Sequence, residues 1–168
     1  MTYSIRAAAP SDIESIYKLI KHYAEIGVIL ERSIDDIKSN INNFIVAAMD
    51  DRVIGVVTYY DYEKEIVEFP RRHGRRGNQN NLVEVRSLAV EESFHKLGIG
   101  RELLLKLIDK VRIEKEIKIF TLTYRPDFFE KNGFIVVSKE SFPEKIWKDC
   151  DKCRDREKCG ETALVYNG

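Results

Sequence analysis

The segment from His95 to Arg101 has the composition of a phosphate-binding loop. Gly98 and Gly100 stand one residue apart, and glycines let a backbone approach a ligand without obstruction by a side chain. A helix is predicted directly after them, and the first amides of a helix bind phosphate oxygens because they have no intrahelical partner. The loop therefore predicts a ligand with a pyrophosphate group. The alternative is that the two glycines only shape a turn between a strand and a helix.

A second group of reactive side chains is the series Cys150-x-x-Cys153-x5-Cys159. Structural zinc sites use similar spacings, but zinc normally takes four ligands and none of the three histidines is close in sequence. We favour reduced thiols that help to fold this segment. Zinc bound by the three cysteines is less favoured, and a disulfide or redox pair is the remaining alternative.

The elements that position these residues alternate between strands and helices. Ser11 with Glu14 and Ser33 with Asp36 fit capping boxes, which predict helix starts at both serines. A third helix follows Gly100. Strands are expected at residues 3–8, 43–49, 53–62, 82–90, 117–123, 134–137 and 163–166. The order predicts a mixed α/β (α+β) fold.

Composition excludes several classes of protein. The 168 residues suffice for one domain, and 28 Lys and Arg balance 28 Asp and Glu. A zero net charge argues against a nucleic-acid binder, although Arg71–Arg76 lies in a basic stretch, residues 63–81, that reads as a long exposed loop. No apolar run approaches the roughly 20 residues of a membrane span. We expect a cytoplasmic protein without a secretory signal or a membrane partner.

The motifs together resemble the GNAT acetyltransferase superfamily. Its loop Arg/Gln-x-x-Gly-x-Gly/Ala cradles the pyrophosphate of acetyl-CoA, and this chain has His95-x-x-Gly98-x-Gly100. The preceding Leu88–Val90 and the later Phe128–Phe134 also match. The resemblance implies one GNAT domain over residues 1–168, with a mostly antiparallel mixed sheet that splays between its fourth and fifth strands. A cysteine-containing segment, residues 143–168, completes it.

The resemblance narrows to the short single-domain N-acetylglutamate synthases of arginine biosynthesis. The segments that carry it are Leu30–Ser33, Glu84–Leu88, Thr121–Tyr124, Pro143–Cys150 and the cysteine series. It implies an amino-acid N-acetyltransferase that moves the acetyl group of acetyl-CoA to the α-amine of L-glutamate. The long stretch 63–81 is larger than expected for that group, which leaves a modified acceptor or partner open.

The resemblance also assigns roles at the donor site. Glu84 aligns with the general base of some GNAT enzymes, and a paired surface carboxylate is its alternative. Phe129 stands where many members carry a tyrosine as general acid, so Tyr124 or solvent is left to protonate the thiolate. The residues expected to contact acetyl-CoA are Leu88, Ala89, Val90, His95, Lys96, Leu97, Gly98, Ile99, Gly100, Arg101 and Phe129.

The two carboxylates of glutamate require cations. Arg86 is the first candidate because Glu84, Arg86 and Leu88 share a face on a regular strand. Arg32 is the second and Lys145 the third, and an exposed surface cation is the alternative for each. A GNAT enzyme with another amine acceptor and a non-catalytic acyl-CoA sensor stay open. A second copy of the chain is a further conceivable partner.

Overall fold

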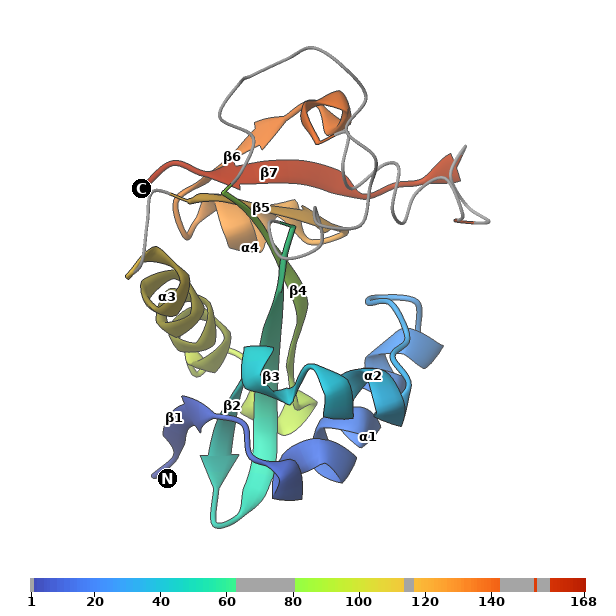
Figure 1. The fold of residues 1–168 in the computed structure, drawn as a ribbon, viewed down its shortest axis with the longest axis vertical. Helices are drawn as coiled ribbons and strands as arrows, with labels where there is room; N and C mark the ends of the chain where they lie inside the picture. The colour runs from blue at the N-terminus through green and yellow to red at the C-terminus, as the bar shows by residue number, and fades with distance from the viewer. Residues whose placement is uncertain (1, 63–80, 114–116, 143–152, 154–157) are drawn as a thin grey trace. The chain divides into compact units, whose positions relative to one another are not determined.

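Seven strands form one sheet in the order β1-β2-β3-β4-β5-β7-β6 (Figure 1). The computed structural model describes residues 2–62, 81–113, 117–142, 153 and 158–168. The strands are β1 (Ser4–Ala7), β2 (Phe44–Met49), β3 (Arg52–Asp61), β4 (Leu82–Val90), β5 (Lys118–Thr123), β6 (Phe134–Val137) and β7 (Thr162–Tyr166). The helices are α1 (Ile13–Glu25), α2 (Ile34–Ser39), α3 (Ile99–Arg112) and α4 (Pro126–Glu130). Because β4 and β5 are parallel while β1–β2, β2–β3, β5–β7 and β6–β7 are antiparallel, the mixed, mostly antiparallel sheet is confirmed.

The chain divides into two compact units, which we describe separately. The first comprises Met1–Tyr60 and Val85–Glu116, and the second comprises Asp61–Glu84 and Ile117–Gly168. Strand β4 contributes to both, because the division falls between Glu84 and Val85.

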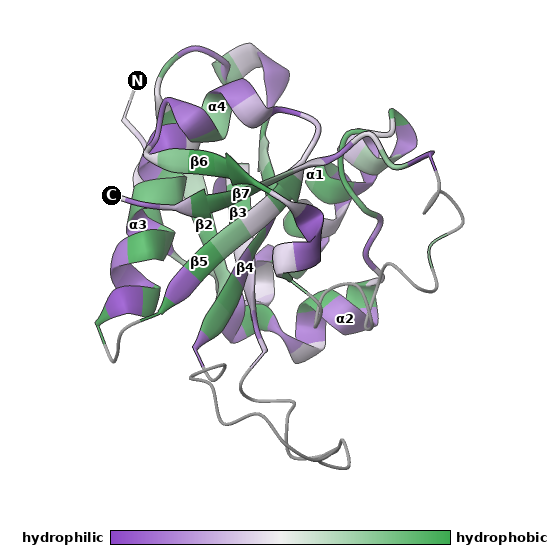
Figure 2. Ribbon diagram, turned by 90° about the horizontal axis from the view of Figure 1, so that it is seen from above, coloured by the Kyte–Doolittle hydropathy of each residue, from purple (hydrophilic) through white to green (hydrophobic). Residues whose placement is uncertain are grey.

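In the first unit, α1 and α2 cover one face of the strands and α3 covers the other (Figures 1 and 2). Figure 2 shows the strands mainly in hydrophobic colours, whereas α3 alternates between hydrophobic and hydrophilic residues. The apolar positions of α3 recur at helical spacing and are buried, which accounts for its packing on the sheet. They are Ile99, Leu103, Leu104, Leu107, Ile108 and Val111.

The two predicted helix starts had different outcomes. The prediction at Ser33 is confirmed, since its Oγ accepts a hydrogen bond from the Asp36 amide at 3.1 Å. The prediction at Ser11 is wrong: a 3-10 turn covers Pro10–Asp12, and α1 begins at Ile13. The Asp12 carboxylate accepts the Ala9 amide at 2.8 Å instead. A buried carboxylate also paired with an arginine replaces the serine hydroxyl as the capping group here.

Buried aromatic rings form the aromatic core of the second unit. The rings of Phe120 and Phe142 stack with centroids 4.0 Å apart, and Tyr62 lies 5.9 Å from Phe120. Phe129 of α4 meets Phe134 of β6 edge to face at 5.2 Å. These buried rings fix α4 on β6 and pack Tyr62 and Phe142 against β5, because aromatic side chains bury a large apolar area.

Strand β4 departs from regular geometry at Ser87. Its parallel register with β5 covers Leu82 to Glu84, the part of β4 that belongs to the second unit, and the splay expected beyond this point stays a prediction. Ser87 has a left-handed backbone, with φ of 49°. The sequence predicts that Glu84, Arg86 and Leu88 share one face of the strand. Regular strand geometry applies only up to Arg86, because an irregular residue such as Ser87 changes the direction of the side chains that follow it.

Candidate active site

The predicted phosphate-binding loop forms the start of α3. Gly98 is its N-cap and has φ of 87°, where a Cβ atom would meet nothing within 4 Å. Glycine is therefore required at this position by backbone conformation and not by space. The Gly98 carbonyl accepts the Glu102 amide at 3.1 Å, so the amides from Ile99 to Arg101 precede the first intrahelical bond. This arrangement fits an anionic ligand such as the pyrophosphate of acetyl-CoA.

The flanks of the loop are open and positively charged. Lys96 has φ of 64° and is exposed, and Leu97 is 56% exposed. Arg101 lies in the first turn of α3 and is also exposed. Within the described part of the chain, neither Lys96 nor Arg101 forms an ion pair. Both cations can approach a phosphate without breaking an existing contact.

His95 is held against the end of β4. Its Nε2 lies 2.7 Å from the carbonyl oxygen of Val90, and because a carbonyl only accepts, the proton is on Nε2. The Tyr23 hydroxyl of α1 donates to the same oxygen at 2.5 Å and lies 3.0 Å from the imidazole nitrogen. The imidazole Nε2 is thus directed into the protein, and the loop amides are left as the donors toward a ligand.

Glu84 is buried, with 3% of its surface exposed. The hydroxyl of Tyr62, itself 5% exposed, donates to its carboxylate at 2.9 Å. Glu84 is therefore not a solvent-exposed carboxylate, which rules out the surface location considered as the alternative. Carboxylates are seldom this deeply buried, and a buried carboxylate is therefore a candidate for a functional role.

Arg32 is fixed by three neighbours in the first unit. Its Nε donates to the Ser87 Oγ at 2.9 Å and its Nη1 to Asp36 at 2.5 Å. The guanidinium also lies 5.8 Å from the centre of the Phe44 ring. Only 15% of the Arg32 side chain is exposed, and among the described residues no hydrogen bond uses its Nη2. Arg32 is a preorganised cation with donors to spare.

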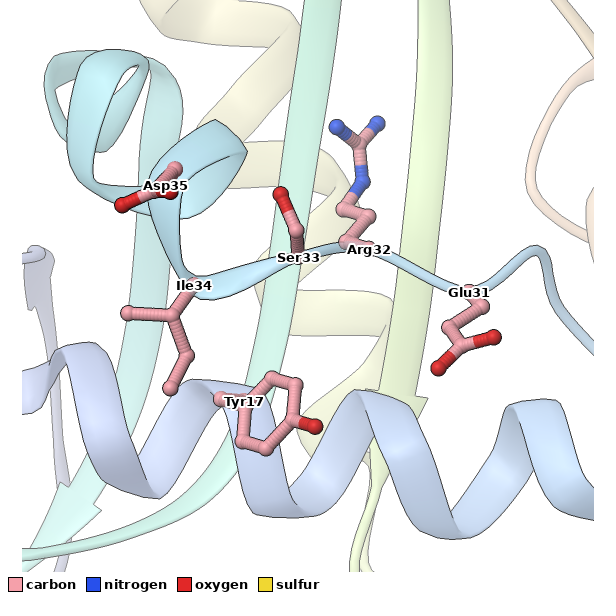
Figure 3. Close-up of a pocket in the computed structure, with 6 residues that line it drawn as sticks. All are labelled: Tyr17, Glu31, Arg32, Ser33, Ile34 and Asp35. Atoms are coloured by element: carbon pink, nitrogen blue, oxygen red, sulfur yellow. The ribbon is translucent and has the colours of Figure 1, made fainter.

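A pocket of ≈ 490 Å³ lies at the segment that carries Arg32. Figure 3 shows the side chains of Arg32 and Ser33 on one side of this segment, with Ile34 directed toward Tyr17 of α1. The lining residues are Tyr17, Glu31, Arg32, Ser33, Ile34 and Asp35. The segment between α1 and α2 therefore places a cation beside β4 and an apolar side chain against α1.

The other candidates in the described residues lie in distinct surroundings. The Arg86 guanidinium is 4.6 Å from the centre of the Tyr60 ring and is only partly exposed. Tyr124 is 49% exposed, and its ring would lie 3.5 Å from a Cβ atom added at Gly160. Phe129 is 5% exposed and belongs to the aromatic core of the second unit. Tyr124 is thus accessible to solvent, whereas Phe129 has a packing role whether or not it touches a ligand.

Some predicted residues lie outside the described part of the chain. They are Lys145, Cys150 and the basic stretch 63–80. Cys153 is exposed, and the Cys159 thiol lies 3.8 Å from a Glu161 oxygen. No group of three metal-ligating side chains occurs among the described residues, a set that omits Cys150, so the zinc hypothesis stays a prediction.

Sequence reasoning missed Tyr23, Tyr62 and Ser87, which hold the predicted residues in place. Tyr23 lies on the buried face of α1, and nothing in its sequence position links it to His95, a residue 72 positions away. Tyr62 directly follows β3, which neighbours the strand β4 that carries Glu84, but the two residues can be paired only when the register of these strands is known. None of the helices in residues 2–62, 81–113 and 117–142 has the length and apolar character to span a bilayer.

Comparison with known proteins identifies the family. Residues 40–136 match the acetyltransferase (GNAT) domain model. The chain belongs to the GNAT acetyltransferase family. It is 35% identical over 162 residues to an uncharacterized N-acetyltransferase of Chlorobaculum tepidum, covering 96% of this chain and 94% of that protein. It is 27% identical to an amino-acid acetyltransferase of Shewanella oneidensis over 84% of this chain, but it spans only 28% of that protein.

Solved structures agree with the GNAT assignment. An N-acetylglutamate synthase from Neisseria gonorrhoeae, complexed with coenzyme A and N-acetyl-glutamate, has a TM-score of 0.77 and 26% identity. It covers 99% of this GNAT chain and 35% of its own. A Mycobacterium tuberculosis protein solved with CoA has a TM-score of 0.74 at 22% identity, covering 97% of this chain and 98% of its own. The GNAT fold is thus shared with proteins that bind CoA.

Proposed function

We propose that this GNAT protein transfers an acetyl group from acetyl-CoA to the α-amine of L-glutamate. The observation that carries the proposal is the buried Glu84, whose carboxylate accepts a hydrogen bond from Tyr62. Glu84 lies on β4, the strand that precedes the phosphate-binding loop at residues 95–101, which we call the donor loop. A protein that only binds acyl-CoA needs no such base. The similarity to amino-acid acetyltransferases and to an N-acetylglutamate synthase supports glutamate as the acceptor.

Glu84 accepts a proton from the acceptor ammonium, directly or through one water molecule. Each unit by which the pKa of the amine exceeds the working pH adds about 1.4 kcal/mol to the barrier, so a nearby base is valuable. The freed amine lone pair then forms the C–N bond at the thioester carbonyl carbon while the C–S bond breaks. A backbone amide near Leu88 or Ala89 polarises the carbonyl. Tyr124 or solvent returns a proton to the thiolate.

The carboxylates of the acceptor bind the arginines of the first unit. Arg32 is the stronger candidate, since Ser87 and Asp36 already fix its guanidinium and its Nη2 is left for a carboxylate. Arg86 stands on β4 with its guanidinium over Tyr60, a placement that also suits a planar anion. The ordering reverses that expected from sequence, where Arg86 came first.

The decisive assay is release of free CoA from acetyl-CoA, followed with a thiol reagent over a panel of amines. We expect saturable turnover with L-glutamate and much less with glutamine, aspartate or short peptides. Glu84→Gln is expected to lower kcat/KM about 10²- to 10³-fold. Arg32→Gln is expected to raise the KM for glutamate about 10- to 100-fold, because one charge-assisted contact is lost.

Two exposed residues of α1 provide matched controls for these variants. Glu14→Gln makes the same substitution as Glu84→Gln at an exposed position. Lys18→Gln removes one positive charge, as Arg32→Gln does, but from the surface of the protein. Both controls should keep the wild-type kinetics. Turnover with a different amine would replace glutamate as acceptor, and tight acetyl-CoA binding without any turnover would favour the sensor function.

A further inference from the structure

The donor loop is held at both ends by contacts with the rest of the first unit, which we call its two anchors. At its far end, α3 is fixed to the sheet through Ile99, which is 1% exposed, and through the close approach of Leu103 to Gly55. At its near end, His95 and Tyr23 both bind the Val90 carbonyl. Between the anchors, the three residues from Lys96 to Gly98 are exposed, and no side-chain hydrogen bond is found for them in the described part of the chain. The two anchors therefore determine where the amides point.

The near anchor is built from well-placed groups. The distances from the Val90 oxygen are 2.5 Å to the Tyr23 hydroxyl and 2.7 Å to His95 Nε2. The two rings are nearly parallel, with centroids 6.4 Å apart and an angle of 21°. Tyr23 is 8% exposed and belongs to the apolar core between α1 and the sheet. Its position is therefore fixed by packing, independently of the loop.

The Tyr23 hydroxyl stays protonated and can therefore always donate its hydrogen bond to the Val90 carbonyl. Burial raises the pKa of Tyr23, and the nearby carboxylates of Glu92 and Glu91 raise it further. The hydroxyl therefore keeps its proton at neutral pH. The backbone completes the turn, because the His95 amide donates to the Glu92 carbonyl at 3.1 Å.

We propose that Tyr23 and His95 form a clamp on the Val90 carbonyl that presets the donor loop for the pyrophosphate of CoA. In this role Tyr23 is a positioning residue outside the sequence motif, and His95 acts through its contact with Val90 instead of through direct contact with phosphate. The inference rests on the proposed use of acetyl-CoA as donor. It does not depend on which amine is the acceptor.

The experiment is titration calorimetry with CoA on the full chain. Tyr23→Phe removes only the hydroxyl, and His95→Ala removes the imidazole. Each should weaken the Kd about fivefold to tenfold, as expected for one lost hydrogen bond. His95→Gln can still donate to Val90 and should restore binding to within about twofold of the wild type.

Tyr3→Phe is the matched control. It also deletes a tyrosine hydroxyl, which donates to the carboxylate of Glu102 in the first turn of α3 at 2.7 Å, but this contact is exposed and lies outside residues 95–101. Its affinity for CoA should stay within about twofold of the wild type. Melting temperatures of the free proteins identify any variant whose loss of affinity comes from unfolding, and His95→Ala, at an exposed position, is the variant least prone to it.

Dephospho-CoA keeps the pyrophosphate and lacks the 3′-phosphate, so the clamp variants should lose affinity for it by the same factor. The proposal is overturned if Tyr23→Phe and His95→Ala bind CoA like the wild type, or if their loss disappears with dephospho-CoA. It is also overturned if His95→Gln is as weak as His95→Ala. If the wild type itself fails to bind CoA, both the proposed function and the clamp are wrong. If the wild type binds CoA and only the variant results above fail, the clamp alone is wrong.

Discussion

Ser87 combines a strained backbone with a side chain that positions a cation. Its φ of 49° lies in a region that costs a residue other than glycine about 1–2 kcal/mol, and its Oγ accepts the Arg32 Nε at 2.9 Å. We expect Ser87→Ala to raise the KM for the carboxylate-bearing acceptor about fivefold with little change in kcat, because Asp36 and the Phe44 ring then hold Arg32 without the Ser87 hydroxyl. Steady-state kinetics with the acceptor found in the amine panel measure this split.

Ser87→Gly separates the hydroxyl from the backbone. It lacks the Oγ as Ser87→Ala does, but it adopts a positive φ without strain. Equal increases in the acceptor KM for both variants would assign the effect to the lost hydrogen bond. A rise in Ser87→Ala alone would contradict a role for the hydroxyl.

Asp12 makes the stability of the protein depend on pH. Hydrogen bonds from Arg6, at 2.6 and 3.0 Å, lower the pKa of the Asp12 carboxyl, and the Ala9 amide adds to this. A pKa that is lower in the folded state stabilises it above the unfolded pKa, near 3.9, and this contribution disappears as the pH falls through the folded value. Asp12→Asn should therefore lower the free energy of unfolding by about 1–3 kcal/mol at pH 7.

Urea unfolding at pH 7 and pH 3 tests the sign of this effect. The difference between wild type and Asp12→Asn should shrink at pH 3, because the Asp12 carboxyl of the unfolded wild-type chain is then largely protonated, which favours unfolding. Asp109→Asn, at an exposed position of α3, is the control and should change little at either pH. A deficit of the same size at both pH values would show that the charge of Asp12 is not what stabilises the fold.

At the scale of elements, the start of α3 depends on one glycine. Gly98→Ala meets no atom within 4 Å but must adopt φ of 87°, so we expect a loss of about 1–2 kcal/mol in stability and a weaker Kd for CoA. Gly98→Asn should lose less, since asparagine tolerates this conformation. Urea unfolding and CoA titration measure the two effects separately.

Gly27 gives a control of the same kind at the end of α1. Its φ is 74° and a Cβ there also meets nothing within 4 Å. Gly27→Ala should therefore lose similar stability without weakening CoA binding. Wild-type CoA affinity in Gly98→Ala would argue that the conformation of this loop does not determine binding.

The elements themselves were largely predictable, because their signals are local. The strand expected at residues 82–90 has the bounds of β4. The strands expected at 43–49 and 53–62 leave only a short turn between them, and there Asp50 and Asp51 have positive φ. The helix at Ser11 failed because a residue outside the capping pattern, Arg6, orients Asp12. Local patterns do not include such partners, and the left-handed residue at Ser87 has no compositional signal at all.

The candidate site was predicted less completely than the fold. Glu84, Arg32 and the donor loop could be named from motifs and a family resemblance. The contacts that hold them could not, because each joins distant segments: Tyr23 and His95 are 72 residues apart, and Arg32 and Ser87 are 55 apart. Such pairs follow from the register of the sheet and the packing of α1, which sequence spacing does not specify.

At the scale of the whole molecule, ligand binding should appear as thermal stabilisation. A ligand that binds only the folded state at 100 times its Kd adds about 2.7 kcal/mol to the free energy of unfolding. For a chain of this size each kcal/mol raises Tm by about 2–4 °C, so saturating CoA should raise it by about 5–10 °C. Differential scanning fluorimetry measures this shift without requiring turnover.

The same measurement identifies the acceptor, because a reaction product stabilises the folded protein only if the protein provides partners for the charged and polar groups of that product. With CoA present, N-acetylglutamate should raise Tm further, and N-acetylglutamine should do so much less because it lacks the second carboxylate. In Arg32→Gln the additional shift with N-acetylglutamate should be largely lost while the shift with CoA persists. A shift with CoA that no N-acetylated amino acid increases would contradict glutamate as the acceptor and leave the donor assignment intact.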